Sequence, residues 1–119
     1  MKIPSLILKQ MYTFGSLKNT EHGIQFGLKN RLADATVTGL VEIAIDGRAL
    51  PLDRVVLDFG GGERRKAADI DAQRPVQFPL RKAVTVEAPC EPLAKGDHEV
   101  VIEFASSFMK GVTRAVYVP

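Results

Sequence analysis

Hydrophobic and polar residues alternate along most of this chain with a period of two. A β-strand turns successive side chains to opposite faces, so this alternation indicates strands with one buried face and one wetter face. In the last such run, Val100 and Ile102 fall on the predicted buried face and Val101 on the wetter one. The pattern as a whole predicts an all-β fold, with strands over residues 24–29, 41–46, 55–59, 84–87 and 97–104.

Turn-forming residues separate the predicted strands. Asp46-Gly47 lies between two apolar runs and indicates a β-hairpin, because glycine readily adopts positive φ and aspartate comes close. The glycines at 60–62 have the composition of a hairpin tip. Further turn signals stand at residues 21–23, 88–89, 95–97 and 110–111, and a polar bend at 106–107. A turn about every ten residues is typical of sandwiches and barrels. We therefore predict a single antiparallel β-sandwich, jelly-roll-like, over residues 1–119.

Two segments give weaker signals. Residues 3–14 place apolar positions on one helical face, yet Tyr12-Thr13-Phe14 favours a strand. We predict a strand over residues 7–17 and keep a helix as the alternative. Residues 66–74 are polar with a few small apolar positions, and either a short helical turn or a loop fits them.

The composition is that of an ordinary globular domain without a strong charge bias. Of 119 residues, 45% are hydrophobic, and sixteen Lys and Arg against fourteen Asp and Glu leave a net charge of +2. Disorder needs low hydrophobicity, and a nucleic-acid binder usually shows a larger basic stripe, so neither is expected. No apolar run approaches the ~20 residues of a membrane helix, so no membrane association is expected. The lone cysteine, Cys90, favours a reducing compartment, and we expect a cytoplasmic protein.

Candidate chemistry is sparse. The two histidines have no cysteine or second histidine at ligand spacing. We interpret His98 as a histidine at the entry of a strand that hydrogen-bonds a loop. Cys90 lies beside Glu91 and has no adjacent base, whereas a reactive cysteine needs a neighbouring base or cation. Acid pairs such as Asp69 with Asp71 indicate a solvated face. The sequence predicts no catalytic residue, metal ligand or cofactor-binding residue in this chain.

Four stretches stand out by their order and spacing. They read Gly-Ile-Gln-Phe-Gly-Leu-Lys-Asn-Arg at 23–31, Thr-Gly-Leu at 38–40, Ile-Asp-Gly-Arg-Ala-Leu-Pro at 45–51 and Leu-Ala-Lys-Gly-Asp-His-Glu-Val at 93–100. Over most of the chain, this order resembles the C-glycoside deglycosidase beta-subunit family of small bacterial proteins.

The resemblance implies a non-catalytic accessory β-sandwich subunit of a carbon–carbon lyase complex. Its partner would be a (β/α)-barrel alpha subunit of the sugar-isomerase type, which would hold a divalent metal, expected to be manganese. The complex would cleave the C–C bond of a 3-oxo C-glycoside substrate, with the metal stabilising the enolate that a base generates. Such a subunit is expected to leave an apolar face exposed when isolated, and therefore to self-associate.

Two rival hypotheses belong to other classes, because fold does not fix function. A stand-alone carbohydrate-binding or adaptor β-sandwich module is the alternative, although sugar stacking usually needs aromatic platforms and the chain has no Trp. An independent small enzyme would need a polar pocket that the sequence does not show. We infer partner-contact residues from their expected exposure: Lys29, Asn30 and Arg31 at the end of one strand, and Arg64, Arg65 and Lys66 in the basic hairpin segment. As a solvated hairpin, that basic segment would need no function.

Overall fold

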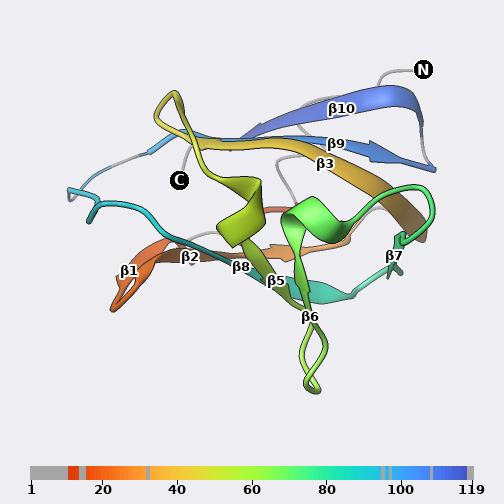
Figure 1. The fold of residues 1–119 in the computed structure, drawn as a ribbon, viewed down its shortest axis with the longest axis horizontal. Coiled ribbons are helices and arrows are strands. Elements are labelled where there is room, and N and C mark those ends of the chain that lie inside the picture. Colours follow the sequence, from red (N-terminus) through yellow and green to blue (C-terminus); the bar gives the residue numbers. More distant parts are fainter. Residues whose placement is uncertain are drawn as a thin grey trace.

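The computed structural model describes residues 11–13, 16–31, 33–94, 96, 98–107 and 109–117, with side chains through residue 107. This part of the chain contains ten strands, which form two antiparallel sheets that face each other (Figure 1). Two short 3-10 helices, η1 (Leu52–Arg54) and η2 (Ala67–Asp69), connect strands. The predicted all-β antiparallel sandwich is confirmed.

The chain crosses between the two sheets repeatedly, which is typical of jelly-roll-like sandwiches. The first sheet has the order β1 (Lys18–Thr20), β2 (Gly23–Lys29), β8 (Ala83–Ala88), β5 (Val56–Asp58) and β6 (Arg64–Lys66). The second has the order β10 (Met109–Tyr117), β9 (Val100–Ser106), β3 (Ala35–Ile45) and β4 (Arg48–Ala49). The short strand β7 (Val76–Phe78) pairs with β3.

The core lies between the sheets and is built from the alternate positions that the sequence predicts. Ile24 and Phe26 of β2 and Val86 of β8 pack there with Ile43 of β3 and Val100 of β9. Each of these five side chains is at most 1% exposed. Burying side chains of this size is the main favourable contribution to folding.

The wetter face predicted for the strand near residue 100 is wrong at Val101. This side chain is 3% exposed although it points away from the core side of the sheet. Ala44, its register partner on β3, is also buried and also lies outside the core cluster. Alternation in the sequence predicts sides of a strand, but it does not predict which sides are covered.

The strongest turn prediction is confirmed. Asp46 and Gly47 connect β3 to β4 with φ of 51° and 82°, the pair of positive angles that a type I′ hairpin turn requires. The turn predicted at residues 110–111 is wrong, because these residues lie within β10, where pairing with β9 shifts between Met109 and Val112. Glycine also marks β-bulges, which explains the misassignment.

The two ambiguous segments are partly resolved. Residues 67–69 form η2, so the helical-turn interpretation of 66–74 is confirmed at its start. In the segment 7–17, residues 7–10, 14 and 15 lie outside the described part. Of its described residues, Tyr12 forms an isolated bridge with Leu28, and residues 11–13, 16 and 17 belong to no strand.

Candidate functional site

Asn30 organises one end of the sandwich from the inside. Its Nδ2 donates hydrogen bonds to the carbonyl oxygens of Phe78 at 2.6 Å and Ala33 at 2.8 Å. Its backbone N–H donates to the Lys82 carbonyl at 2.9 Å, and its own carbonyl accepts from the Arg81 N–H at 2.6 Å. The side chain is fully buried, so the exposure expected of Asn30 as a partner-contact residue is wrong. Instead, Asn30 ties the loop after β2 to the loop between β7 and β8.

The loop between β7 and β8 contains a tight turn with an unusual residue in it. The Lys82 N–H donates to the Pro79 carbonyl at 3.0 Å, which closes a four-residue turn. Arg81, the third residue of this turn, has φ of 72°. Glycine or asparagine usually occupies such a position, because a Cβ is crowded there. Leu80 is 45% exposed, and its N–H donates to Asp34 Oδ1 at 2.7 Å.

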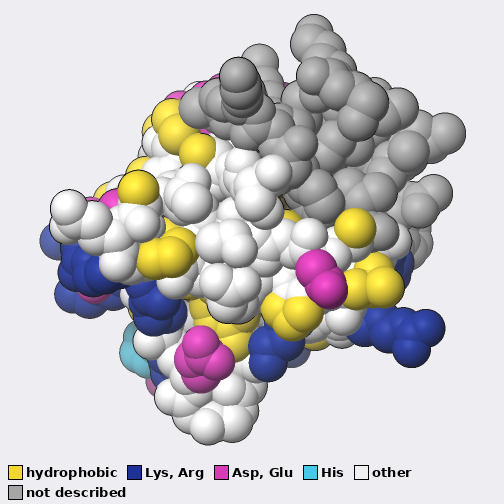
Figure 2. Space-filling model, turned by 90° about the vertical axis from the view of Figure 1, so that its right-hand side faces the viewer, with side chains coloured by type: hydrophobic (Ala, Val, Ile, Leu, Met, Phe, Trp, Pro, Cys, Tyr) yellow, Lys and Arg dark blue, Asp and Glu magenta, His cyan; other side chains and the backbone are white. Residues whose placement is uncertain are grey.

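These contacts define a basic surface around one exposed leucine, which we call the Leu80 surface. It consists of Lys29, Arg31, Leu80, Arg81 and Lys82. The strand end and loops that carry it lie near β7, at the right-hand end of Figure 1. Figure 2 faces this end and shows Lys and Arg side chains on both flanks, with hydrophobic groups and some Asp and Glu side chains between them. Two of the six predicted partner-contact residues, Lys29 and Arg31, therefore belong to one surface.

In the predicted basic hairpin segment, Arg64 and Arg65 contact other residues of this domain. Arg64 forms ion pairs with Asp58 at 2.9 Å and Glu87 at 2.5 Å, on the outer face of the first sheet. The hydrogen bond with Glu87 is the main cause that raises the pKa of Arg64 above its usual value. Arg65 donates to the Arg74 carbonyl at 2.8 Å, whereas Lys66 is exposed. A partner contact through this segment stays a prediction, with Lys66 its most available cation.

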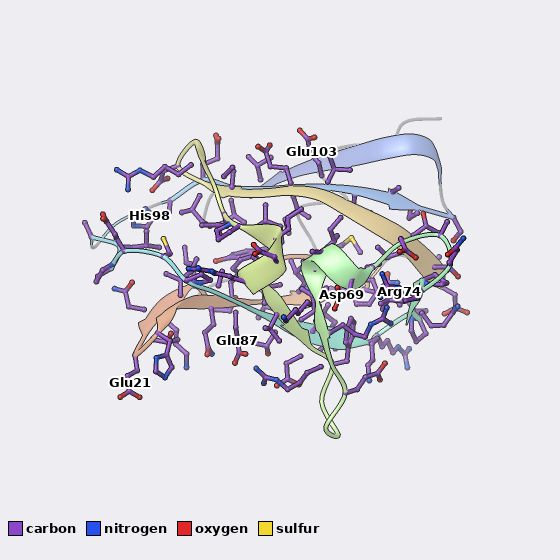
Figure 3. All side chains as sticks on the ribbon, viewed as in Figure 1. Glu21, Asp69, Arg74, Glu87, His98 and Glu103 are labelled. Carbon is purple, nitrogen blue, oxygen red and sulfur yellow. The ribbon has the colours of Figure 1, made fainter. Side chains whose placement is uncertain are left out.

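A shallow cleft of about 510 Å³ lies on the outer face of the first sheet. It extends from the β1–β2 turn, with Glu21 and His22, to η1, with Arg54. Figure 3 shows Glu21 and Glu87 on this side of the sheet, pointing away from the sandwich. The cleft lining mixes acidic, basic and amide side chains with aliphatic ones and the imidazole of His22, and no Phe, Tyr or Trp side chain is among them. It therefore offers hydrogen bonds but no platform on which a sugar ring would stack.

His98 pairs with Asp46, an acid 52 positions away in the sequence. Its Nδ1 lies 2.6 Å from Asp46 Oδ2 and its Nε2 lies 2.7 Å from the Ala94 carbonyl. Asp46 Oδ1 accepts from the Glu99 N–H at 2.9 Å. The hydrogen bond with His98 is the main cause that lowers the pKa of Asp46 below its usual value. The prediction that His98 hydrogen-bonds a loop is confirmed.

The His98–Asp46 pair resembles the histidine and carboxylate of a catalytic triad, but it differs in what the Nε2 atom of the histidine faces. In a triad the carboxylate orients one ring nitrogen, and the other nitrogen faces the nucleophile. Here Nε2 faces the Ala94 carbonyl, which only accepts hydrogen bonds, so Nε2 must carry a proton and donate it. Nδ1 faces Asp46 Oδ2 in turn, so both ring nitrogens are engaged in contacts within the fold. The pair joins the β3–β4 turn to the start of β9.

Three other features bear on the class of protein. Among the residues that the structure describes, no group of three or more His, Cys, Asp and Glu side chains is placed to hold a metal ion. Within the same residues, no helix is long and apolar enough to cross a membrane. The broad exposed apolar face that we expected is not found there either, because Val41 and Leu80 are the exposed large hydrophobic residues.

The fold and these contacts define a small β-sandwich domain whose polar clusters brace its loops. A family model described as hydroxymethylglutaryl-CoA reductase, N-terminal domain, matches residues 7–114, and the chain belongs to this family. A search of curated proteins gave no match.

The family assignment corrects the resemblance to C-glycoside deglycosidase beta subunits, which is wrong. The stretches that carried this resemblance are general features of sandwiches. Residues 45–51 contain the Asp46-Gly47 hairpin turn, and residues 23–31 are a strand with its end. Many unrelated β-sandwiches need such turns and strand ends, so their order alone does not identify a family.

Proposed function

We propose that this chain is a non-catalytic accessory domain that acts bound to a catalytic partner domain. The observation that carries the proposal is the His98–Asp46 pair. Among the residues that the structure describes, it is the arrangement most similar to a catalytic dyad, yet both ring nitrogens and both carboxylate oxygens are engaged in joining two loops. A general base must reach the proton that it removes, and His98 Nε2 faces a backbone carbonyl instead.

The family name indicates which partner to test first. It describes the N-terminal domain of a reductase, so we propose the catalytic region of a hydroxymethylglutaryl-CoA reductase as the partner. The accessory role itself does not depend on the deglycosidase resemblance. A deglycosidase complex with a manganese-bearing barrel subunit stays untested, and without the resemblance it has no separate support. Cytoplasmic location is part of the proposal, on the basis of the single cysteine.

A sugar-binding role has weaker support. The cleft on the first sheet carries carboxylates and guanidinium groups that suit hydroxyl groups, but its described lining has no Phe, Tyr or Trp ring. We therefore favour the adaptor form of the alternative over the carbohydrate-binding form.

The test combines turnover with a variant that separates structure from chemistry. Turnover of hydroxymethylglutaryl-CoA is measured for the catalytic region alone, for this chain alone, and for mixtures with wild-type or His98→Gln chain. We expect no turnover by the chain alone. Below the melting temperature of His98→Gln, both mixtures should turn over substrate within about twofold of each other. Turnover by the chain alone would contradict the proposal. So would a folded, bound His98→Gln chain that abolishes turnover.

A further inference from the structure

We propose that the Leu80 surface docks on a protein surface that carries carboxylates around an apolar pocket, with Leu80 entering the pocket. This inference rests on the proposed accessory function, because it names the chemistry of the partner and the part of the chain that contacts it.

Charge favours an acidic partner. Lys29, Arg81 and Lys82 form no ion pair within the described structure, and Arg31 adds a fourth cation to the same end. Elsewhere in the described structure, Arg48, Arg64 and Arg74 each pair with an acid. Asp34 lies beside Leu80 and offsets one of these charges, so the surface keeps an excess of cations. Such a surface steers association toward an opposite charge and sets its orientation.

The backbone at Arg81 favours a functional reason for this residue. A non-glycine residue at φ of 72° is strained, and such strain persists where surrounding contacts impose it. Here the imposing contacts are the hydrogen bond from the Arg81 N–H to the buried Asn30 and the turn bond from Lys82 to Pro79. Glycine would fit the turn without strain, but it would remove a guanidinium group from the surface. Held this way, the turn presents Leu80 and Arg81 with little freedom to lose on binding.

Leu80 favours a protein pocket over a lipid surface. It is one of two exposed large hydrophobic residues among those described, and the other, Val41, lies on β3 of the opposite sheet. Membrane-surface binding usually needs a broad apolar face, which a single leucine does not provide. A single aliphatic anchor surrounded by charges is instead typical of a protein interface, where a few central residues carry most of the affinity. Val41 therefore provides a matched control.

Two binding measurements test the surface. The first is the dissociation constant for the reductase catalytic region, with wild-type chain and with Leu80→Ser, Arg81→Asn, Val41→Ser and Arg54→Asn. Asparagine tolerates positive φ, so Arg81→Asn removes the charge without straining the turn further. Arg54 is exposed, forms no ion pair in the described structure and lies on η1, so its variant controls for loss of one positive charge. The second is an NMR titration of labelled chain with a synthetic Glu- and Leu-rich peptide.

We expect Leu80→Ser and Arg81→Asn each to weaken reductase binding about tenfold, and the two control variants to bind within about twofold of wild type. The peptide should shift the amide signals of residues 79–82 and leave those of residue 41 in place. If the reductase binds wild type and Leu80→Ser equally, the docking surface is wrong while the accessory function stands. If the reductase does not bind but the peptide shifts residues 79–82, the proposed partner is wrong and the surface stands. Unchanged signals with the peptide would overturn the inference. It would also be overturned if, in comparison titrations, phosphatidylserine vesicles or duplex DNA bound the wild-type chain more tightly than the peptide does and Leu80→Ser abolished that binding.

Discussion

Replacing Arg81 by glycine should make the isolated domain more stable. A left-handed backbone conformation costs a residue with a Cβ about 1–2 kcal/mol, because the Cβ crowds the following carbonyl. Arg81 has this conformation at φ of 72°. Glycine removes the crowding but gives the unfolded chain more freedom, which costs about 0.5–1 kcal/mol. The expected net gain is therefore about 0.5–1 kcal/mol.

The turn should accept glycine without loss of its hydrogen bonds. The Arg81 N–H bonds to Asn30 and the Lys82 N–H bonds to Pro79 through backbone atoms alone. The Arg81 side chain is exposed, and no ion pair involves it in the described structure. Its removal therefore takes away no contact that holds the fold.

The assay is urea unfolding followed by circular dichroism, with Arg81→Ala as the matched variant. Alanine removes the guanidinium but keeps the Cβ, so it should stay within about 0.5 kcal/mol of wild type. The glycine variant should unfold at higher urea with an unchanged slope and melt about 2–4 °C higher than wild type. If Arg81→Gly is no more stable than Arg81→Ala, the strain argument is refuted.

Three further predictions concern the braces of the fold. Asn30→Ala removes the side-chain donor of the hydrogen bonds to the Phe78 and Ala33 carbonyls. It should lower the free energy of unfolding by about 2–4 kcal/mol in urea denaturation. A loss below about 1 kcal/mol would show that Asn30 does not hold the two loops together. Because the pKa of Asp46 is lowered in the folded state, its contribution to stability is present above the unfolded value near 3.8 and is lost as pH falls through the lower folded value. Urea midpoints from about pH 5 to about pH 2 should therefore show wild type converging toward Asp46→Asn, and a constant gap would contradict the assigned cause. In Gly23→Ala the new Cβ would lie 2.0 Å from the Ala88 carbonyl oxygen, so this variant should lose several kcal/mol or fail to fold, whereas Gly61→Ala, with open space around it, should lose only about 1 kcal/mol.

Much of the fold follows from local patterns in the sequence. Strands β2 and β8 were predictable because their alternate apolar residues face one core. The Asp46-Gly47 hairpin was predictable because its positive φ angles favour those residue types. Local patterns failed where coverage or pairing decides the outcome. Val101 is buried on the face expected to be wet, and Gly111 lies in a strand beside a register shift.

The candidate site was less predictable, because its contacts join distant parts of the chain. The nitrogen of Asn30 bonds to a carbonyl 48 residues away, and His98 bonds to an acid 52 residues away. A single sequence shows each residue type but not these pairings. From the sequence, Asn30 was therefore predicted to be an exposed contact residue, and Asp46 was predicted only as a turn residue. The positive φ of Arg81 is likewise invisible, since arginine carries no preference for that conformation.

The central claim is that this chain is an accessory domain that works on a catalytic partner. The most direct test is sedimentation velocity of the full chain mixed with the catalytic region of a hydroxymethylglutaryl-CoA reductase, together with turnover by the isolated chain. The account predicts that the two proteins sediment as one complex and that the isolated chain has no turnover. Separate sedimentation at micromolar concentrations, or turnover by the chain alone, would contradict it.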